Sequence, residues 1–329
     1  LFYLCTRKTI DMGFFKSLFG GKSGNPDEER NKQVQKEFEV LKYDGIRAYR
    51  MRRFDYARKC FEEAVKLQDD YETYGHLAQL LVETGDLKGA LAPLRHMAQA
   101  EPTIAANFIT LANVYFMLED YYKMADAAQM AIHLAPEDPQ PYCLKGKSAL
   151  ALAMESEAES LLSNAISLRA DYAEALLLRG QVYLGQGQLE KALQDAEAVI
   201  ASEKEVDSGL LLRAAVREVQ GNTAEAEDDY REVLKIEPFN QQAYVSLGKL
   251  YIQQQRYEDA ISIMDDAIEM NPVFAQAYEL RAEAKKLSGN AEGAANDAMA
   301  AANLKAASEV TTEVADPAAS IKEIDILHL

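Results

Sequence analysis

Side chains that could act as nucleophiles, general bases or metal ligands are few in this chain, and their spacing assembles no site. Histidine occurs four times and cysteine three times in 329 residues. The residues concerned are His76, His96, His133, His328, Cys5, Cys60 and Cys143. None stands at HExxH or CxxC spacing, and neither a GxxxxGK[ST] phosphate loop nor a GxSxG turn occurs. Because catalysis requires such groups to converge, we expect no catalytic residue, no metal site and no cofactor, hence no enzyme.

The charge of the chain excludes further classes of function. The formal net charge is -18 at pH 7, whereas a nucleic-acid binder needs a surplus of Lys and Arg to meet phosphates. Residues 1–68 carry 15 Lys and Arg against 10 Asp and Glu, and residues 69–329 carry 20 against 43. The apolar run Leu1 to Cys5 is too short for a membrane span or a signal peptide. We therefore expect a soluble cytoplasmic protein that does not bind nucleic acid.

The chain repeats itself with a period of 34 residues, starting at Phe38 and including one step of 33. Position 20 of the units is alanine except for Met124, position 27 is Ala, Val or Met, and position 32 is proline in four units. Position 8 is always small: Gly45, Ala78, Ala112, Gly146, Gly180, Ala214, Gly248 and Ala282. A fixed period of this length is typical of a repeat architecture rather than of a globular domain.

Each unit has the sequence pattern of two helices. In one unit a first helix around Gly248 breaks near Arg256, and a second runs from Tyr257 to Met270 and stops before Pro272. Small residues at positions 8 and 20 fit a close helix crossing, because a larger side chain would separate the two backbones. Proline at position 32 ends the second helix, and the same logic makes Asp138 an N-cap.

This pattern resembles the tetratricopeptide repeat family, in eight tandem units: 38–70, 71–104, 105–138, 139–172, 173–206, 207–240, 241–274 and 275–308. The resemblance implies an all-α fold, a right-handed α-α superhelical solenoid of helix-turn-helix repeats. Residues 1–37 would form a leader, a linker and an N-terminal helix from Pro26, and residues 309–329 a flexible spacer with a short C-terminal helix. Arg217 and Lys285 replace the usual aromatic at position 11, which predicts looser packing in units six and eight.

The resemblance also implies a concave groove, lined by the first helices, that binds a peptide or a helix of a protein partner. Positions 2, 5, 9, 12 and 13 of each unit would face it. The expected groove residues are Ile109, Asn113, Phe116, Met117, Cys143, Lys147, Leu150, Leu177, Gln181, Leu184, Leu211, Lys249 and Ile252. Their apolar majority favours an apolar or amphipathic segment, with amides and Lys147 available for hydrogen bonds. Alternatively, the same apolar residues pack against neighbouring units and never contact a ligand.

One binding mode of the family, a clamp for a C-terminal carboxylate, is not expected. Its places in the first three units would need basic and amide residues, and only Lys42 fits.

The sequence therefore predicts a non-enzymatic interaction scaffold, whose partner and oligomeric state it does not identify. The alternatives are a membrane-peripheral assembly factor, anchored weakly by the apolar leader Phe14–Phe19, or a regulatory subunit of an enzyme. Residues 1–11, which precede Met12, are interpreted as upstream sequence outside the natural start.

Overall fold

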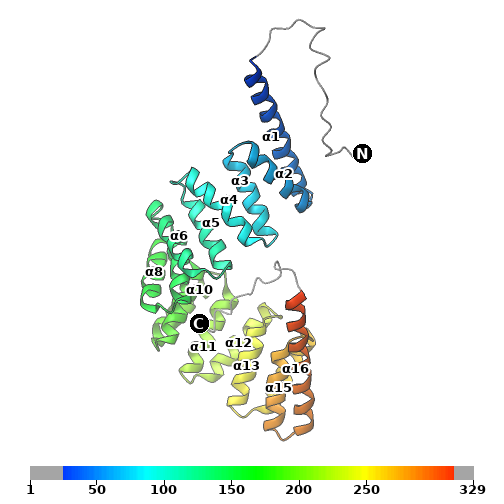
Figure 1. Ribbon diagram of the computed structural model, residues 1–329. Helices are drawn as coiled ribbons and strands as arrows, with labels where there is room; N and C mark the ends of the chain where they lie inside the picture. Colours follow the sequence, from blue (N-terminus) through cyan, green and yellow to red (C-terminus); the bar gives the residue numbers. More distant parts are fainter. Residues whose placement is uncertain (1–24, 315–329) are drawn as a thin grey trace. The chain divides into compact units, whose positions relative to one another are not determined.

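A computed structural model describes residues 25–314, in which sixteen α-helices and no strand occur. Figure 1 follows them along the chain. Their bounds are α1 Pro26–Arg50, α2 Phe54–Leu67, α3 Tyr71–Glu83, α4 Leu87–Ala100, α5 Ala105–Met117, α6 Tyr121–Leu134, α7 Pro139–Ala151, α8 Glu155–Leu168, α9 Ala173–Gly185, α10 Leu189–Ala201, α11 Val206–Val219, α12 Thr223–Ile236, α13 Gln241–Gln253, α14 Tyr257–Met270, α15 Ala275–Leu287 and α16 Ala291–Val314. Each predicted unit thus holds two helices, and the all-α repeat fold is confirmed.

The chain forms two compact parts, one up to Leu80 and one from Leu81 onward. In the second part, each helix from α4 to α16 packs against the next along the chain. First helices of neighbouring repeats, such as α9 and α11 or α13 and α15, also contact each other. This is the layered stacking of a solenoid, in which every repeat is supported by its neighbours.

The ends of the array differ in part from expectation. The helix predicted from Pro26 is confirmed as the start of α1, whose N-cap Asn25 accepts a hydrogen bond from the Asp27 backbone N–H. At the other end, α16 continues to Val314, so the spacer expected from residue 309 is wrong for residues 309–314. Ala and Glu favour helix there, and no Gly or Pro interrupts the chain before Pro317. The leader, the 1–11 segment and the terminal helix from Ser320 lie outside the described residues.

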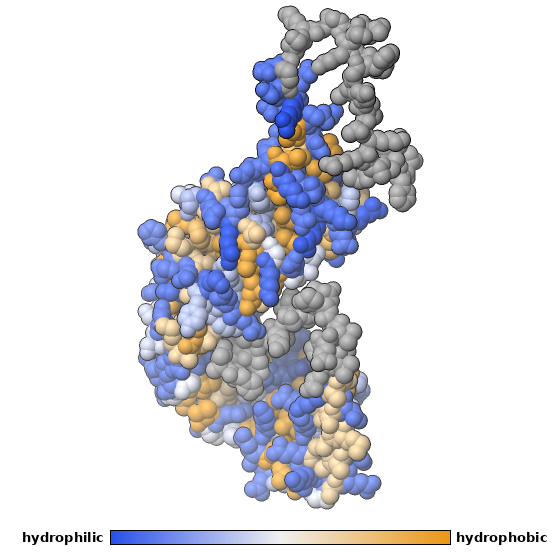
Figure 2. Space-filling model, viewed as in Figure 1, coloured by the Kyte–Doolittle hydropathy of each residue, from blue (hydrophilic) through white to orange (hydrophobic). Residues whose placement is uncertain are grey.

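The alanine content of α16 also shapes the surface. In Figure 2 this last helix is a pale orange, weakly apolar area at the lower right, whereas hydrophilic side chains are spread over most of the face shown. Met299 on α16 is exposed as well.

The turn inside each repeat has one recurrent backbone feature. Position 15 adopts a positive φ in all eight units: Arg52, Gly85, Glu119, Ala153, Gly187, Gly221, Gln255 and Gly289. Only glycine takes up this left-handed conformation without steric cost, so the four other residues are held there by the packing of the helices on either side. The turn geometry is therefore a property of the repeat rather than of the residue that occupies it.

The small residues at position 8 have the predicted role. A Cβ atom added to Gly146 would lie 2.9 Å from Cδ2 of Leu162 on the paired helix, and one added to Gly248 would lie 2.7 Å from Cε of Met264. At position 20, Met124 is fully buried, as are the alanines of most other units. Close crossing of paired helices thus explains both positions.

A second set of contacts, between charged side chains, links the two helices within a repeat. In units five, six and eight, an arginine at position 7 of the first helix forms a bidentate ion pair with an aspartate at position 23 of the second. The pairs are Arg179–Asp195, Arg213–Asp229 and Arg281–Asp297, with N···O distances between 2.6 and 3.0 Å. All three aspartates are buried, so these charges are paired rather than solvated. We call these three pairs the arginine staples.

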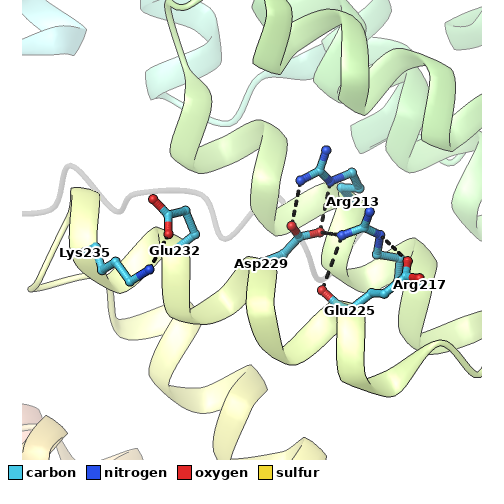
Figure 3. A network of polar contacts seen from close by, with 6 residues as sticks. All are labelled: Arg213, Arg217, Glu225, Asp229, Glu232 and Lys235. Carbon is cyan, nitrogen blue, oxygen red and sulfur yellow. Dashed lines mark hydrogen bonds and ion pairs between the residues drawn. The ribbon is translucent and has the colours of Figure 1, made fainter.

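The staples correct the expectation of looser packing at position 11. Arg217 pairs with Asp229 at 2.6 Å, and Lys285 pairs with Asp297 at 2.8 Å. Figure 3 shows Arg213 and Arg217 converging from α11 on Asp229 of α12. In these two units a second cation joins the staple where units three, five and seven have a tyrosine, and it links the same pair of helices.

Polar contacts also cross from one repeat to the next, along two routes. The first runs from the staples: Arg281 donates to Asp265 of the preceding second helix at 2.6 Å. The second uses tyrosine at position 11, which accepts a hydrogen bond from an arginine at position 25 of the preceding unit. Arg95 donates to Tyr115 in this way at 2.9 Å, and Arg231 to Tyr251 at 2.7 Å. Together these contacts fix the register of successive helix pairs.

Candidate protein-binding groove

The second compact part contains a groove of about 1070 Å³. Its walls come from α7, α9, α11, α13 and α15, the first helices of units four to eight, and from the turns that lead into three of them. The residues that line it are Lys147, Arg169, Asp171, Tyr172, Ala173, Glu174, Leu177, Leu178, Gln181, Lys204, Glu205, Asp207, Ser208, Leu211, Leu212, Glu237, Phe239, Asn240, Gln241, Gln242, Val245 and Gln276. Successive repeats place equivalent positions along this groove, because the first helix of each repeat has the same orientation within its repeat.

Four of the predicted residues lie in the groove wall: Lys147, Leu177, Gln181 and Leu211. They come from three different repeats, at positions 5 and 9. Val245, at position 5 of unit seven, also borders the groove but is only 3% exposed, so it belongs largely to the core. The structure thus brings together a continuous set of side chains that are 34 residues apart in sequence.

The other predicted residues lie outside this wall. Ile109, Asn113, Phe116 and Met117 are partly exposed on α5, and Lys249 is exposed on α13. Leu150, Leu184 and Ile252 are partly buried against core clusters, and so are Leu177 and Leu211 of the groove wall.

Cys143 departs from the expectation for position 5. It is only 1% exposed and packs with Ala158 and Leu162 in the core between α7, α8 and α9. Burial raises the pKa of its thiol, and the charge of Glu174 raises that pKa further. Cys143 therefore belongs to the core and is a neutral thiol rather than a groove ligand.

Two lysines of the groove are already paired with acids. Lys147 Nζ lies 2.8 Å from Glu174 and 4.3 Å from the centroid of the Phe116 ring. Lys204 Nζ lies 2.6 Å from Asp171. The expectation that Lys147 is available for a ligand's backbone therefore does not describe this structure, since its ammonium is held by a carboxylate and an aromatic face.

The third cation of the groove is stacked on a ring. The Arg169 guanidinium lies 3.6 Å from the centroid of Tyr172, and the Tyr172 hydroxyl donates to Glu174 at 3.3 Å. Burial raises the pKa of the Tyr172 hydroxyl, so it stays protonated and can donate.

Three acids of the groove have no cation paired with them among the described residues. Glu205 and Asp207 lie at the start of α11, and Glu237 is the C-cap of α12. Burial raises the pKa of the Glu205 carboxyl, and the nearby charges of Glu174 and Asp207 raise it further. Leu177 and Leu211, in contrast, contribute apolar side chains to the groove wall.

The predicted groove positions all lie in the first helices, so the prediction missed the wall residues that lie in the turns before those helices. Arg169, Lys204 and Glu237 precede the first helices, at positions 31 and 32 of their units. Position 2 was expected to face the groove, and Glu174, Ser208, Gln242 and Gln276 occupy it in four consecutive units. The signal that could have found the turn residues is the same repeat register, extended past the proline at position 32.

The remaining candidate chemistry gives no second site. In residues 25–314, no group of three or more His, Cys, Asp or Glu is placed to hold a metal ion. Lys42, the one match to a carboxylate clamp, is largely buried and pairs with Asp70 at 2.9 Å and with Glu72 at 2.6 Å. No helix within the described part of the chain has the length and apolarity needed to cross a bilayer.

Comparisons with known proteins agree with this architecture. Family models described as tetratricopeptide repeat match residues 45–103, 143–208, 183–243 and 220–284. DnaJ homolog subfamily C member 3 of Gallus gallus is 34% identical over 175 residues, which cover 49% of this chain and 35% of the relative. DnaJ homolog subfamily C member 7 homolog of Schizosaccharomyces pombe is 22% identical over 317 residues, covering 86% and 67%. The chain thus spans about a third of the length of the chicken relative.

A solved structure shares the fold. The crystal structure of a tetratricopeptide repeat protein from Parabacteroides merdae ATCC 43184 superposes with a TM-score of 0.60 at 19% identity. The match covers 75% of this chain and 98% of that one. With family models matching more than half of its residues and sixteen helices in about eight repeats, the chain belongs to the tetratricopeptide repeat family.

Proposed function

We propose that this protein is a non-enzymatic scaffold that binds a segment of a partner protein in the groove of units four to eight. The observation that carries the proposal is the groove itself: positions 2, 5 and 9 recur along it over several consecutive repeats. A linear segment can meet such a periodic surface one repeat at a time, which a compact pocket would not allow. We place the protein in the cytoplasm, where the buried thiols of Cys60 and Cys143 would stay reduced.

The wall offers two kinds of contact to an extended chain. Leu177 and Leu211, which are half-buried, give an apolar strip on which side chains of a partner can be buried. Amide side chains stand beside that strip and can hydrogen-bond the partner's backbone, whose N–H and C=O groups would otherwise be left unpaired. Gln181 and Gln276 are the amides best placed for substitution, because neither is buried.

The proposal is tested by blocking the groove without disturbing the core. The double variant Gln181→Arg with Gln276→Arg fills the groove with two long side chains. Its matched control is Gln99→Arg with Gln194→Arg, which makes the same change at exposed positions of the second helices α4 and α10. Affinity purification with mass spectrometry compares the proteins recovered by wild type, groove variant and control.

The groove variant should lose specific partners that the control keeps, while both retain the helical circular dichroism of the wild type. Recovery of the same partners by all three proteins, with equal yields, would refute binding in this groove. Loss of helical signal in the groove variant alone would show that Gln181 or Gln276 supports the fold instead.

A further inference from the structure

The groove has more negative charge than its own cations neutralise. Five acids and three bases line it. Lys147 and Lys204 are paired with Glu174 and Asp171, and Arg169 is stacked on a tyrosine. The carboxylates left over are those of Glu205, Asp207 and Glu237, which we call the open acids. Together they give the groove a local negative potential, because no cation of residues 25–314 is paired with them.

Two of the open acids stand where a negative charge is unfavourable for the fold. Glu205 is disfavoured as a carboxylate by burial and by Glu174 and Asp207. Glu237 is the C-cap of α12, where the helix dipole is negative and repels an anion. Asp207, in the first turn of α11, is the exception, since the helix N-terminus favours it. Charge kept at a cost to stability is characteristic of a functional surface.

An exposed aromatic ring lines the same groove and follows one of these acids closely in sequence. Phe239 is 64% exposed and lines the groove two residues after Glu237. The face of an aromatic ring attracts a cation, and its edge and area favour apolar contact. Lys and Arg side chains combine an apolar stem with a cationic end. Such a side chain suits this surface, because the carboxylate and the ring attract its cationic end while the apolar strip contacts its stem.

We propose that the groove selects partner segments in which arginine or lysine alternates with apolar residues. This inference rests on the proposed function and specifies its partner. The cationic ends pair with the open acids and lie against Phe239, while the apolar side chains contact Leu177 and Leu211. The same charge repels an acidic segment or a free C-terminal carboxylate, so the selectivity is opposite to that of a carboxylate clamp.

The test measures binding of defined peptides to the full chain by fluorescence anisotropy. Three fluorescein-labelled nine-residue peptides share alternating leucines, with arginine, glutamine or glutamate at the positions between. The groove variant carries Glu205→Gln, Asp207→Asn and Glu237→Gln. The control carries Glu190→Gln, Glu258→Gln and Glu269→Gln, which removes the same number of charges from exposed positions on α10 and α14 outside the groove.

The arginine peptide should bind the wild type at least about tenfold more tightly than the glutamine peptide, and the glutamate peptide should bind weakest. The groove variant should lose that preference and bind the arginine and glutamine peptides alike. The control should keep the preference. Thermal unfolding of the groove variant should occur at or above the wild-type temperature, since two unfavourable charges have been removed.

Three results would overturn the inference: equal affinity of the wild type for the arginine and glutamine peptides, equal loss of preference in both variants, or no binding of any peptide. A groove variant that unfolds at a lower temperature would assign the open acids a structural role and would also overturn it. These outcomes are separate from failure of the proposed function. If the peptides show no preference while the Gln181→Arg, Gln276→Arg variant still loses its partners, the groove binds partner segments of another chemistry.

Discussion

Asp229 is the residue at which the contribution of an arginine staple can be measured most directly. Its carboxylate accepts hydrogen bonds from Nε and Nη2 of Arg213 at 3.0 and 2.7 Å, and from Nη1 of Arg217 at 2.6 Å. The side chain of Asp229 is 5% exposed, whereas those of the two arginines are 22% and 21% exposed. Asp229→Ala therefore leaves two cations without their shared anion at the interface of α11 and α12.

The expected cost follows from this geometry. Removing one partner of a buried ion pair typically destabilises a protein by about 3 to 5 kcal/mol, because the remaining charge is left uncompensated. Water can reach part of each guanidinium, so we expect the lower end of that range, about 3 kcal/mol. The measurement is urea unfolding followed by far-ultraviolet circular dichroism. The m-values of the variants are compared to verify that unfolding exposes the same amount of surface.

Two further variants separate the loss of a pair from the loss of a carboxylate. Asp228→Ala removes an exposed carboxylate from the neighbouring position and should change stability by less than about 0.5 kcal/mol. The triple variant Arg213→Leu, Arg217→Tyr and Asp229→Ile introduces the residues that unit seven has at positions 7, 11 and 23. It should remain within about 1.5 kcal/mol of the wild type, since replacing a whole buried ion network with apolar groups is often neutral.

The outcome that refutes this reasoning is equally specific. If Asp229→Ala costs no more than Asp228→Ala, the staple contributes nothing measurable. If the triple variant is as unstable as Asp229→Ala, the cost comes from lost packing volume rather than from unpaired charge.

Further predictions concern a buried acid and the repeat turns. Burial raises the pKa of Glu218 above its ordinary value, only partly offset by a hydrogen bond with Tyr230, and its Oε1 has no hydrogen-bond partner. The folded state therefore disfavours ionised Glu218: the cost is present above the raised pKa and absent below the unfolded value. Glu218→Gln should raise the unfolding temperature at pH 7.5, and the gain should shrink toward pH 4.5; a gain independent of pH would contradict this. In the turns, Ala153→Gly should stabilise by about 1 kcal/mol and Gly187→Ala should destabilise by about as much, since both sites have left-handed φ and a Cβ on Gly187 meets no atom within 4 Å. Chemical unfolding of the two variants measures both, and a shift of the same sign in both would contradict the argument.

The helices could be predicted from sequence because their determinants are local. Tyr257 and Met270 bound α14 as expected, and Asp138 caps α7 by accepting from the Gln140 backbone N–H. The small residues, the prolines and the apolar spacing act within one unit and recur across the eight units. A misleading residue in one unit is therefore outweighed by the pattern of the others. The boundary at residue 308 was misplaced because helix α16 simply continues past the last recognisable unit.

The groove was predicted only in part, for a physical reason. A position number tells which way a side chain leaves its helix, as for Leu177 and Leu211, but not how the turn before that helix folds. Phe239 and Glu205 lie in such turns. Cys143 shows the opposite error. Its position within the unit predicted a groove residue, whereas its side chain packs in the core. The arginine staples were missed because residues 16 apart share no helix face, although Arg at position 7 and Asp at position 23 occur together in units five, six and eight.

The arginine staples also bear on how the chain acquires its structure. Each joins residues 16 apart, the arginine–tyrosine links join residues 20 apart, and the groove pair Lys204–Asp171 joins residues 33 apart. Connections this short cost little loop-closure entropy and give a low contact order, which favours rapid folding. A repeat can therefore complete its own links as soon as its second helix leaves the ribosome, and the next repeat then folds onto a finished surface.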